Sequence, residues 1–404
     1  MAIGNVASET RPGSAAEVFW AFLRLGLTSF GGPIAHLGYF RNEFVARRRW
    51  VDEAAYADLV ALCQFLPGPA SSQVGFALGL LRAGPLGALA AWTAFTLPSA
   101  LVLVLVASGA AAFDGPVGRG LLHGLKITAV AVVAQAVLGM ARSLTPDRER
   151  AAIAVVAAVL VTLTGGALGQ VAAIVAGGLL AGVLCPAADA PAAAALPAPV
   201  SRRAGTAALG LFLALLLALP LAASVLAWQG VALFDAFFRA GALVFGGGHV
   251  VLPLLEAALV QPGWVGGDAF LAGYGAAQAV PGPLFTFGAY LGFVMEPAPH
   301  GLTGAVLALV AIFLPGLLLV VGALPFWSVL RTRGDAQTVM RGANAAVVGL
   351  LAVALVHPIG TNAIADPLDA VLAAAAFLLL VAAGMPSWAV VLLTALAGLA
   401  VSLV

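Results

Sequence analysis

Two arginines occupy matching positions in the two halves of this sequence, each within an apolar stretch. Arg24 lies in "FWAFLRLGLTSFGG" and Arg239 in "FDAFFRAGALVFGG", each six residues before a Phe-Gly-Gly. If these stretches lie in a membrane, each charge costs about 2.5–3.5 kcal/mol on insertion scales, so the residue usually has a function or a partner. A guanidinium fork matches an oxyanion at two points. The pair therefore indicates anion binding; snorkelling to an interface, or pairing with Glu43 or Glu256, is the alternative.

Glycine and proline interrupt the chain at two places in each half. Inside a bilayer, each backbone group freed by such a break costs several kcal/mol unless protein, water or ligand satisfies it. A helix that begins at a break presents free N–H groups and about half a positive charge, which suits an anion. The breaks therefore predict the walls of one central binding pocket, with kinks and close helix packing as the alternative. They comprise Gly31, Gly32, Pro33, Pro67, Gly68, Pro69, Gly246, Gly247, Gly248, Pro281, Gly282 and Pro283.

Further polar residues accompany the breaks and could contact an oxyanion. Gln64 and Gln278 each lie three residues before a Pro-Gly-Pro, and Gln73 follows the first one. Capping of the half-helices is the alternative role of these amides. Lys126 and Asn344 occupy matching positions in "GLKITAVA" and "GANAAVVG", where helix packing is the alternative to a substrate contact.

Four titratable residues are candidates for proton coupling. Glu43 and Glu256 follow the first break of each half, and His36 and His249 lie close to the same breaks. The two histidines do not align with each other at the offset that aligns the glycines. A hydrogen-bonded packing role is therefore the alternative for both histidines.

Composition restricts the class of protein. Hydrophobic residues make up 62% of the 404 residues, charged residues make up 9%, and the mean hydropathy is +1.09, which predicts an all-α polytopic membrane protein. The net charge of +1 gives no reason to expect a nucleic-acid partner, and the first residues lack the pattern of a cleaved signal peptide. Cys63 and Cys185 form no metal or disulfide motif, and the only lysine lies outside any phosphate-binding loop. No cofactor, no metal and no enzymatic activity are expected.

An internal repeat organises the chain. The second half aligns on the first at an offset of about 215 residues, with the order of the shared motifs preserved. The long apolar run 151–184 is predicted to form a hairpin that turns at Gly165-Gly166. The predicted divisions are an N-terminal cytoplasmic tail (1–16), a first transmembrane repeat (17–184), a linker plus connecting transmembrane helix (185–227) and a second transmembrane repeat (228–404).

The broken segments allow two topologies. If all four cross the membrane, the arginines between Arg41 and Arg49 lie outside the cell, which violates the positive-inside rule at its strongest cluster. If each segment dips in and returns, these arginines lie in the cytoplasm, and the connecting helix gives the second half the opposite orientation. Both arrangements stay open here; the rule favours an inverted repeat with re-entrant, Gly/Pro-broken helices at the centre. The broken segments are 17–40, 54–81, 234–256 and 268–295.

The motifs resemble those of the chromate ion transporter family in its long form with two fused halves. They are "FGGPIAHLGYFRNEFVARRRW", "QFLPGPASSQVGFALGLLRAG" and "FTLPS" in the first half, and "FGGGHVVLPLLE", "QAVPGPLFTFGAYLG" and "GANAAVVGLL" in the second. The resemblance implies a secondary transporter that exports chromate across a bacterial inner membrane and gives chromate resistance. The site residues that the resemblance implies are the glycines and prolines of the four breaks, together with Glu43 and Gln73.

Two other functions are compatible with the same sequence features. The main substrate could be sulfate, a dianion of the same tetrahedral shape, or another oxyanion, by transport or exchange. A non-transporting membrane scaffold subunit is the alternative class. The coupling mode is open between proton antiport, anion exchange and uniport, and small residues on apolar faces would permit a homodimer within the membrane lipid.

Overall fold

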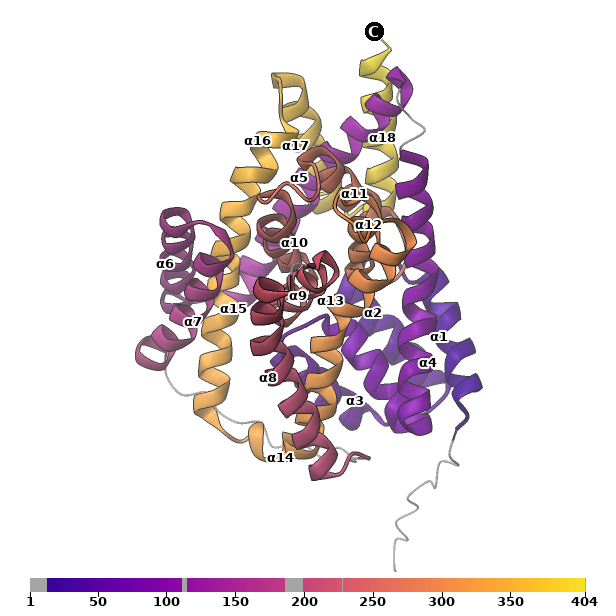
Figure 1. The fold of residues 1–404 in the computed structure, drawn as a ribbon, viewed down its shortest axis with the longest axis vertical. Helices are drawn as coiled ribbons and strands as arrows, with labels where there is room; N and C mark the ends of the chain where they lie inside the picture. Colours follow the sequence, from indigo (N-terminus) through magenta and orange to yellow (C-terminus); the bar gives the residue numbers. More distant parts are fainter. Residues whose placement is uncertain (1–12, 111–114, 186–198, 227, 404) are drawn as a thin grey trace, which may run out of the picture.

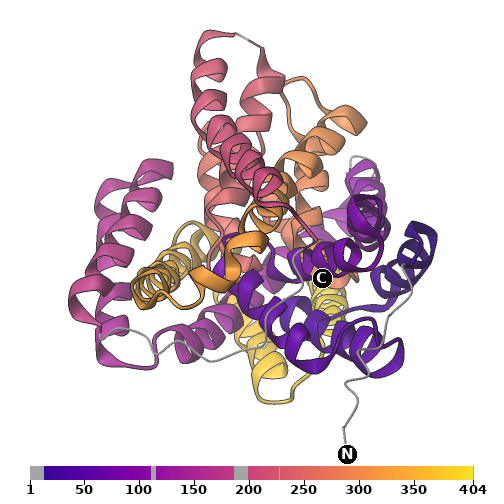
Figure 2. The same ribbon diagram turned by 90° about the horizontal axis from the view of Figure 1, so that it is seen from below.

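The computed structural model describes residues 13–110, 115–185, 199–226 and 228–403, and every element in these ranges is helical (Figures 1 and 2). Most of the predicted tail 1–16 and most of the Pro/Ala-rich linker lie outside the described residues. The first half contains α1 (Ala15–Thr28), α2 (Gly32–Phe40), the π-helix η1 (Arg41–Arg47), α3 (Glu53–Phe65), α4 (Ala70–Ala110), α5 (Pro116–Leu144), α6 (Arg148–Thr164) and α7 (Gly166–Leu184).

The connecting helix α8 (Arg202–Val225) leads into the second half. Its elements are α9 (Gln229–Ala242), η2 (Gly248–Val250), α10 (Val251–Leu255), the π-helix η3 (Glu256–Val260), α11 (Gly267–Ala279), η4 (Leu284–Thr286), α12 (Phe287–Val294), α13 (Gly301–Ala323), η5 (Leu324–Phe326), α14 (Trp327–Leu330), α15 (Gly334–Ala354), η6 (Leu355–Gly360), α16 (Thr361–Ala363), α17 (Pro367–Val381) and α18 (Ser387–Ser402).

Local sequence sets several helix ends. Ser14, Asp52 and Asp147 precede α1, α3 and α6, and each side chain accepts a hydrogen bond from the backbone N–H three residues later. Gly165, at a φ of 64°, ends α6 and begins α7, so the hairpin predicted over 151–184 is confirmed. Long α4 is bent at Gly84, where φ is 65° and a proline follows, so it consists of two helical arms.

Within the described residues, six helices are long and apolar enough to cross a membrane. None of the residues in the most apolar window of α8 is buried, so this helix presents its leucines outward, as expected of a lipid-facing helix. The chain is therefore a multi-pass membrane protein. The six candidate spans belong to α4, α5, α7, α8, α13 and the α15–α16 segment.

The two broken segments of the first half begin and end at one end of the molecule. The N–H of Gly13, just before α1, donates to the carbonyl of Arg82 at the end of the first arm of α4 (3.0 Å). Glu17 accepts hydrogen bonds from the Trp50 indole and from Arg82. In the second half, the N–H of Glu296 after α12 donates to the carbonyl of Trp264 before α11 (3.0 Å). The two ends of the first-half pair of segments therefore lie together, as do the two ends of the segment between Trp264 and Glu296.

The last helices of each half pack against the other half. The hairpin of α6 and α7 lies against α15, and α17 and α18 lie against α5 (Figure 2). Aromatic rings fill the core beneath the breaks: Phe22 packs on Phe40 and Phe44 in the first half, and Phe287 packs on Phe270 and Tyr274 in the second. The packing of these helices on the opposite half, together with the aromatic core, fixes the positions of the four breaks relative to one another.

Candidate functional site

Each break in one half is hydrogen-bonded to a break in the other half. The N–H of Gly68 donates to the carbonyl of Val244 (2.7 Å), and the N–H of Gly282 donates to the carbonyl of Ser29 (2.9 Å). Ser29 and Val244 occupy the same position in the repeat, two residues before the paired glycines. The bonds are therefore reciprocal, and they satisfy backbone groups that the breaks leave without a partner inside a helix.

The contacts extend from the Pro-Gly-Pro breaks to the long helices of the opposite half. A Cβ atom on Gly68 would lie 3.1 Å from the Cα of Gly316 in α13, and one on Gly282 would lie 2.8 Å from the Oγ of Ser99 in α4. A Cβ atom on Gly248 would lie 3.7 Å from the ring of Pro33, so the two glycine-rich breaks also approach each other. All four breaks thus meet at one place.

Buried polar atoms without a protein partner surround this meeting place. Gln73 is fully buried; its Nε2 donates to the carbonyls of Pro67 (2.9 Å) and Gly316 (3.1 Å), whereas its Oε1 has no partner. A buried polar atom without a partner costs about 1–3 kcal/mol, so such a group marks where water or a ligand binds. Among the described residues, the buried side-chain atoms beside the breaks that lack a hydrogen bond are Ser29 Oγ, Ser72 Oγ, Gln73 Oε1, Thr96 Oγ1 and Asn344 Oδ1.

The predicted amides differ in their surroundings. Gln278 has a buried Nε2 beside the Tyr274 hydroxyl, three residues before the second Pro-Gly-Pro, whereas Gln64 is exposed. Asn344 lies beside the other glycine break, because a Cβ atom on Gly246 would be 3.7 Å from its Oδ1. Gln73, Gln278 and Asn344 therefore belong to the meeting place of the breaks.

The two arginines have different environments despite their matching positions. The Arg239 side chain is 44% exposed and forms an ion pair with Asp235, whose side chain is 4% exposed. Together they line a pocket of about 410 Å³ between α7, α8 and α9. Arg24 is exposed on α1. Neither guanidinium has a hydrogen bond to a break residue among those found in the described residues, and Arg239 is held by its carboxylate.

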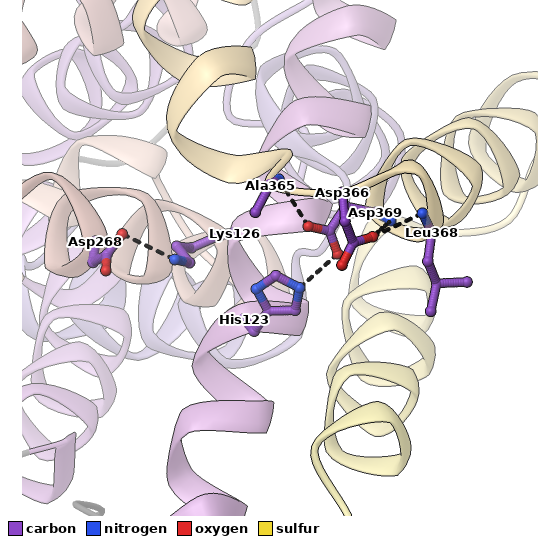
Figure 3. Close-up of polar contacts among 7 residues, drawn as sticks. All are labelled: His123, Lys126, Asp268, Ala365, Asp366, Leu368 and Asp369. Atoms are coloured by element: carbon purple, nitrogen blue, oxygen red, sulfur yellow. Dashed lines mark hydrogen bonds and ion pairs between the residues drawn. The ribbon is translucent and has the colours of Figure 1, made fainter. Parts of the chain in front are cut away.

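Lys126 lies away from the breaks. Its Nζ donates to Asp268 at the start of α11 (2.9 Å), and it lines a cavity with His123 near one end of α5 (Figure 3). Its counterpart Asn344 lies at the breaks, so the two residues have different environments although their positions match in the repeat.

The two glutamates predicted for proton coupling also differ. Glu43 in η1 accepts hydrogen bonds from Arg48 (2.6 Å) and Arg47 (2.8 Å). Burial opposes ionisation of Glu43, but the hydrogen bonds from Arg48 and Arg47 outweigh it and hold the pKa of the carboxyl below its ordinary value. Glu256 in η3 accepts a hydrogen bond from Gln261 instead (3.3 Å). Glu43 is therefore held as an anion by two cations, whereas Glu256 has a neutral partner.

The two histidines contact residues next to the breaks. His36 is buried; its Nε2 donates to the Ser29 carbonyl (3.2 Å), and its Nδ1 lies 3.3 Å from Ser71 Oγ. The Nδ1 of His249 lies 2.7 Å from the hydroxyl of Tyr274. Each histidine precedes its π-helix glutamate by seven residues, so the two correspond when counted from the glutamates. The glycine-based alignment misses this because the second half is two residues shorter there.

Some residues of this region gave no signal in the sequence. Ser29 matters through its backbone carbonyl, which any residue could supply. Asp58 in α3 accepts hydrogen bonds from Trp327 (2.9 Å) and Arg331 (3.0 Å), which joins the two halves at one end of the molecule. Asp235 could have been found, because it precedes Arg239 by four residues, the spacing of an ion pair on a helix.

A helical membrane protein with two repeated halves, whose broken helices meet around unpaired polar atoms, has the organisation of a secondary transporter. The chain belongs to the chromate transporter family: the family model "Chromate transporter" matches residues 16–183 and again 231–399. This is the long form with two family-model halves, and the family is one of transporters and not of enzymes.

Curated relatives are similar over most of their length. A "Probable chromate transport protein" of Synechococcus elongatus is 30% identical over 83% of this chain and 82% of its own. A "Chromate transport protein" of Pseudomonas aeruginosa is 29% identical over 75% of this chain and 71% of its own. Another of that description, from Cupriavidus metallidurans, is 28% identical over 83% and 80%. No solved structure matches the chain.

Proposed function

We propose that this protein is a secondary transporter that exports chromate from the cytoplasm and thereby gives chromate resistance. The carrying observation is the meeting of all four breaks through the reciprocal bonds of Gly68 and Gly282, surrounded by buried polar atoms without partners. Both donors and acceptors are among these atoms, so a hydrated or partly hydrated tetrahedral oxyanion finds hydrogen bonds there that an apolar solute would leave unmade. The curated relatives named for chromate transport support chromate as the ion.

The physics of a charged membrane supports the outward direction. Moving a dianion out of an inside-negative compartment releases about 4.6 kcal/mol per 100 mV. That free energy corresponds to a concentration ratio of about three orders of magnitude. Export therefore needs no further coupling, whereas uptake would.

The test is chromate flux in proteoliposomes. Liposomes loaded with radiolabelled chromate and carrying the purified protein are expected to lose it faster when a potassium diffusion potential makes the interior negative. Protein-free liposomes are the control, and unlabelled sulfate added as a competitor tests the second oxyanion. Flux of sulfate without flux of chromate would favour the sulfate alternative. No anion flux at all, from protein that is folded in detergent, would favour the scaffold alternative.

We further propose that the halves form an inverted repeat with re-entrant broken helices in a bacterial inner membrane. Helices α3 and α14 lie at one end of the molecule (Figure 1), where Asp58 of α3 accepts a hydrogen bond from Arg331 after α14. The arginine-rich segment 41–49 precedes α3. This end would be cytoplasmic by the positive-inside rule. The divisions at 1–16, 17–184, 185–227 and 228–404 remain our proposal, as does a homodimer.

Labelling of single cysteines tests this topology. In a protein with serine at Cys185, a cysteine at Ala46 is expected to react with a membrane-impermeant maleimide only in inside-out vesicles, because it lies among the arginines of η1. A cysteine at exposed Gln261, in the matching segment of the second half, should react only in intact spheroplasts. Reaction of both from the same side would contradict the inverted repeat.

Glu256 is the proposed site of any proton coupling in this mechanism. Glu43 is held by two arginines that favour its ionised form, whereas Glu256 has an uncharged amide as its partner. His36 and His249 remain candidates that contact the break regions through Ser29 and Tyr274.

A further inference from the structure

A cavity of about 610 Å³ lies at the start of α5, apart from the meeting place of the breaks. Arg119, His123 and Lys126 line it from α5, at spacings of four and three residues that place them on one helix face. The start of α11, with Asp268, lies opposite, and Tyr290 and Ser402 complete the polar part of the lining. Two cationic side chains, Arg119 and Lys126, and the His123 imidazole thus lie on one wall of the cavity, and Lys126 is the only lysine in the chain.

Two carboxylates pair with this wall, and they are held differently (Figure 3). Asp369 has a side chain only 3% exposed; it accepts from the N–H of Ala365 (2.9 Å) and contacts the His123 ring (2.6 Å). Asp268 has a side chain 80% exposed, and Lys126 is its one partner found in the described residues. The first carboxylate is a fixed part of the structure, whereas the second is free to turn into solvent.

Lys126 is the less exposed partner of the second pair. Its side chain is 16% exposed, against 80% for Asp268, and it lines the cavity, so an anion that enters the cavity reaches its ammonium group. The carboxylate of an exposed aspartate gains little from such a pair, because water solvates it almost as well. A dianion that enters the cavity offers the ammonium group a stronger partner at the same place.

We propose that this cavity is a second oxyanion site, in which Lys126 binds a tetrahedral dianion and Asp268 is a resident carboxylate that the dianion displaces. This site rests on the proposed transport of oxyanions, and it would be a second binding site for the transported ion, away from the breaks. Asp268 then acts as a competitor within the protein: it keeps the ammonium group paired when the site is empty, and it lowers the affinity so that the ion can leave.

The position in the fold fits an outlet from the breaks. Helix α11 runs from Asp268, at the cavity, to Gln278, which lies three residues before the second Pro-Gly-Pro. Ten residues of α-helix span about 15 Å, so one short helix connects the two sites. Helices α11 and α18, which line the cavity, lie toward the end of the molecule opposite α3 and α14 (Figure 1). The end with α3 and α14 is the one that we propose to be cytoplasmic. The site would therefore lie on the outer side of an exporter.

The test uses equilibrium binding of radiolabelled chromate to the purified full-length protein in detergent. The wild-type protein is expected to bind two ions per chain, with the weaker class belonging to this cavity. Lys126→Gln should remove the weaker class or weaken it at least tenfold. Asp268→Asn should tighten the same class about threefold or more, because it removes the competing carboxylate. Asp335→Asn, an exposed aspartate in the first turn of α15, is the matched control and should change neither class.

The opposite signs of the two variants separate the proposal from a structural ion pair. A purely structural pair would make both variants lose binding and thermal stability together, and that result would overturn the proposal. Unchanged binding in both variants, in protein that still transports chromate, would also overturn it while leaving the proposed function intact. Wild-type protein that neither binds nor transports chromate would overturn the proposed function itself.

Discussion

Alanine at Gly68 or at Gly282 is expected to lower chromate transport at least tenfold. Both glycines have positive φ, 123° and 104°, which side chains with a Cβ atom rarely adopt. The new methyl group would lie 2.9 Å from the Gln73 amide in the first case and 2.8 Å from the Ser99 hydroxyl in the second. The backbone would have to move, and each reciprocal hydrogen bond to Ser29 or Val244 would lengthen with it.

The expected magnitude is large for a single methyl group. A left-handed backbone costs about 1–2 kcal/mol with a Cβ atom present, and overpacking of a tight contact costs about 1–3 kcal/mol more. Proteoliposome flux should fall at least tenfold, and the unfolding temperature in detergent should fall with it. Because the two positions are equivalent in the repeat, both variants should behave alike.

Gly139→Ala is the matched control. Gly139 lies within α5, and a Cβ atom there would meet nothing within 4 Å. Alanine also favours a helix more than glycine does by about 1 kcal/mol, so flux and stability should be retained. Normal flux in both Gly68→Ala and Gly282→Ala would show that the breaks tolerate a side chain and do not form the transport site.

The sequence alone predicted where the helices break, but not how the breaks contact each other. Paired glycines and prolines within apolar segments interrupt helices for local reasons, so their positions follow from residue type. The bond from Gly68 to Val244 joins residues 176 apart, through a backbone carbonyl that carries no side-chain signal. Such a contact depends on how the two halves pack against each other. A local sequence pattern does not specify that packing.

The arginines illustrate the opposite problem, because a matching pattern led to an expectation of matching roles. Arg24 and Arg239 share their spacing to the glycines, but Asp235 has a tryptophan at the corresponding position in the first half, Trp20. Trp20 is 68% exposed, whereas Asp235 is buried against Arg239. The ion pair of Arg239 therefore depends on Asp235, a residue that has no acidic counterpart in the first half. Contact of either arginine with the substrate remains a prediction.

Arg239→Gln is expected to destabilise the protein strongly, by about 3 kcal/mol. The substitution leaves the nearly buried carboxylate of Asp235 without its counter-ion; breaking such a pair typically costs about 3–5 kcal/mol, and the half-exposed guanidinium places this case at the lower end. Asp235→Asn combined with Arg239→Gln removes both charges and should restore most of the stability. Unfolding temperatures in detergent measure both effects, and Arg24→Gln, at the exposed matching position, should leave stability unchanged.

Chromate flux through the stable double variant then decides what Arg239 does. If its guanidinium contacts the ion, flux should stay at least tenfold below that of the wild type although the fold is restored, because an amide replaces a charge that faces a dianion. If flux returns with stability, Arg239 serves only to neutralise Asp235, and the breaks alone bind the anion. The double variant can separate the two roles of Arg239. Stability depends on whether the charges of Asp235 and Arg239 balance each other, whereas binding of a dianion depends on the positive charge of Arg239 alone.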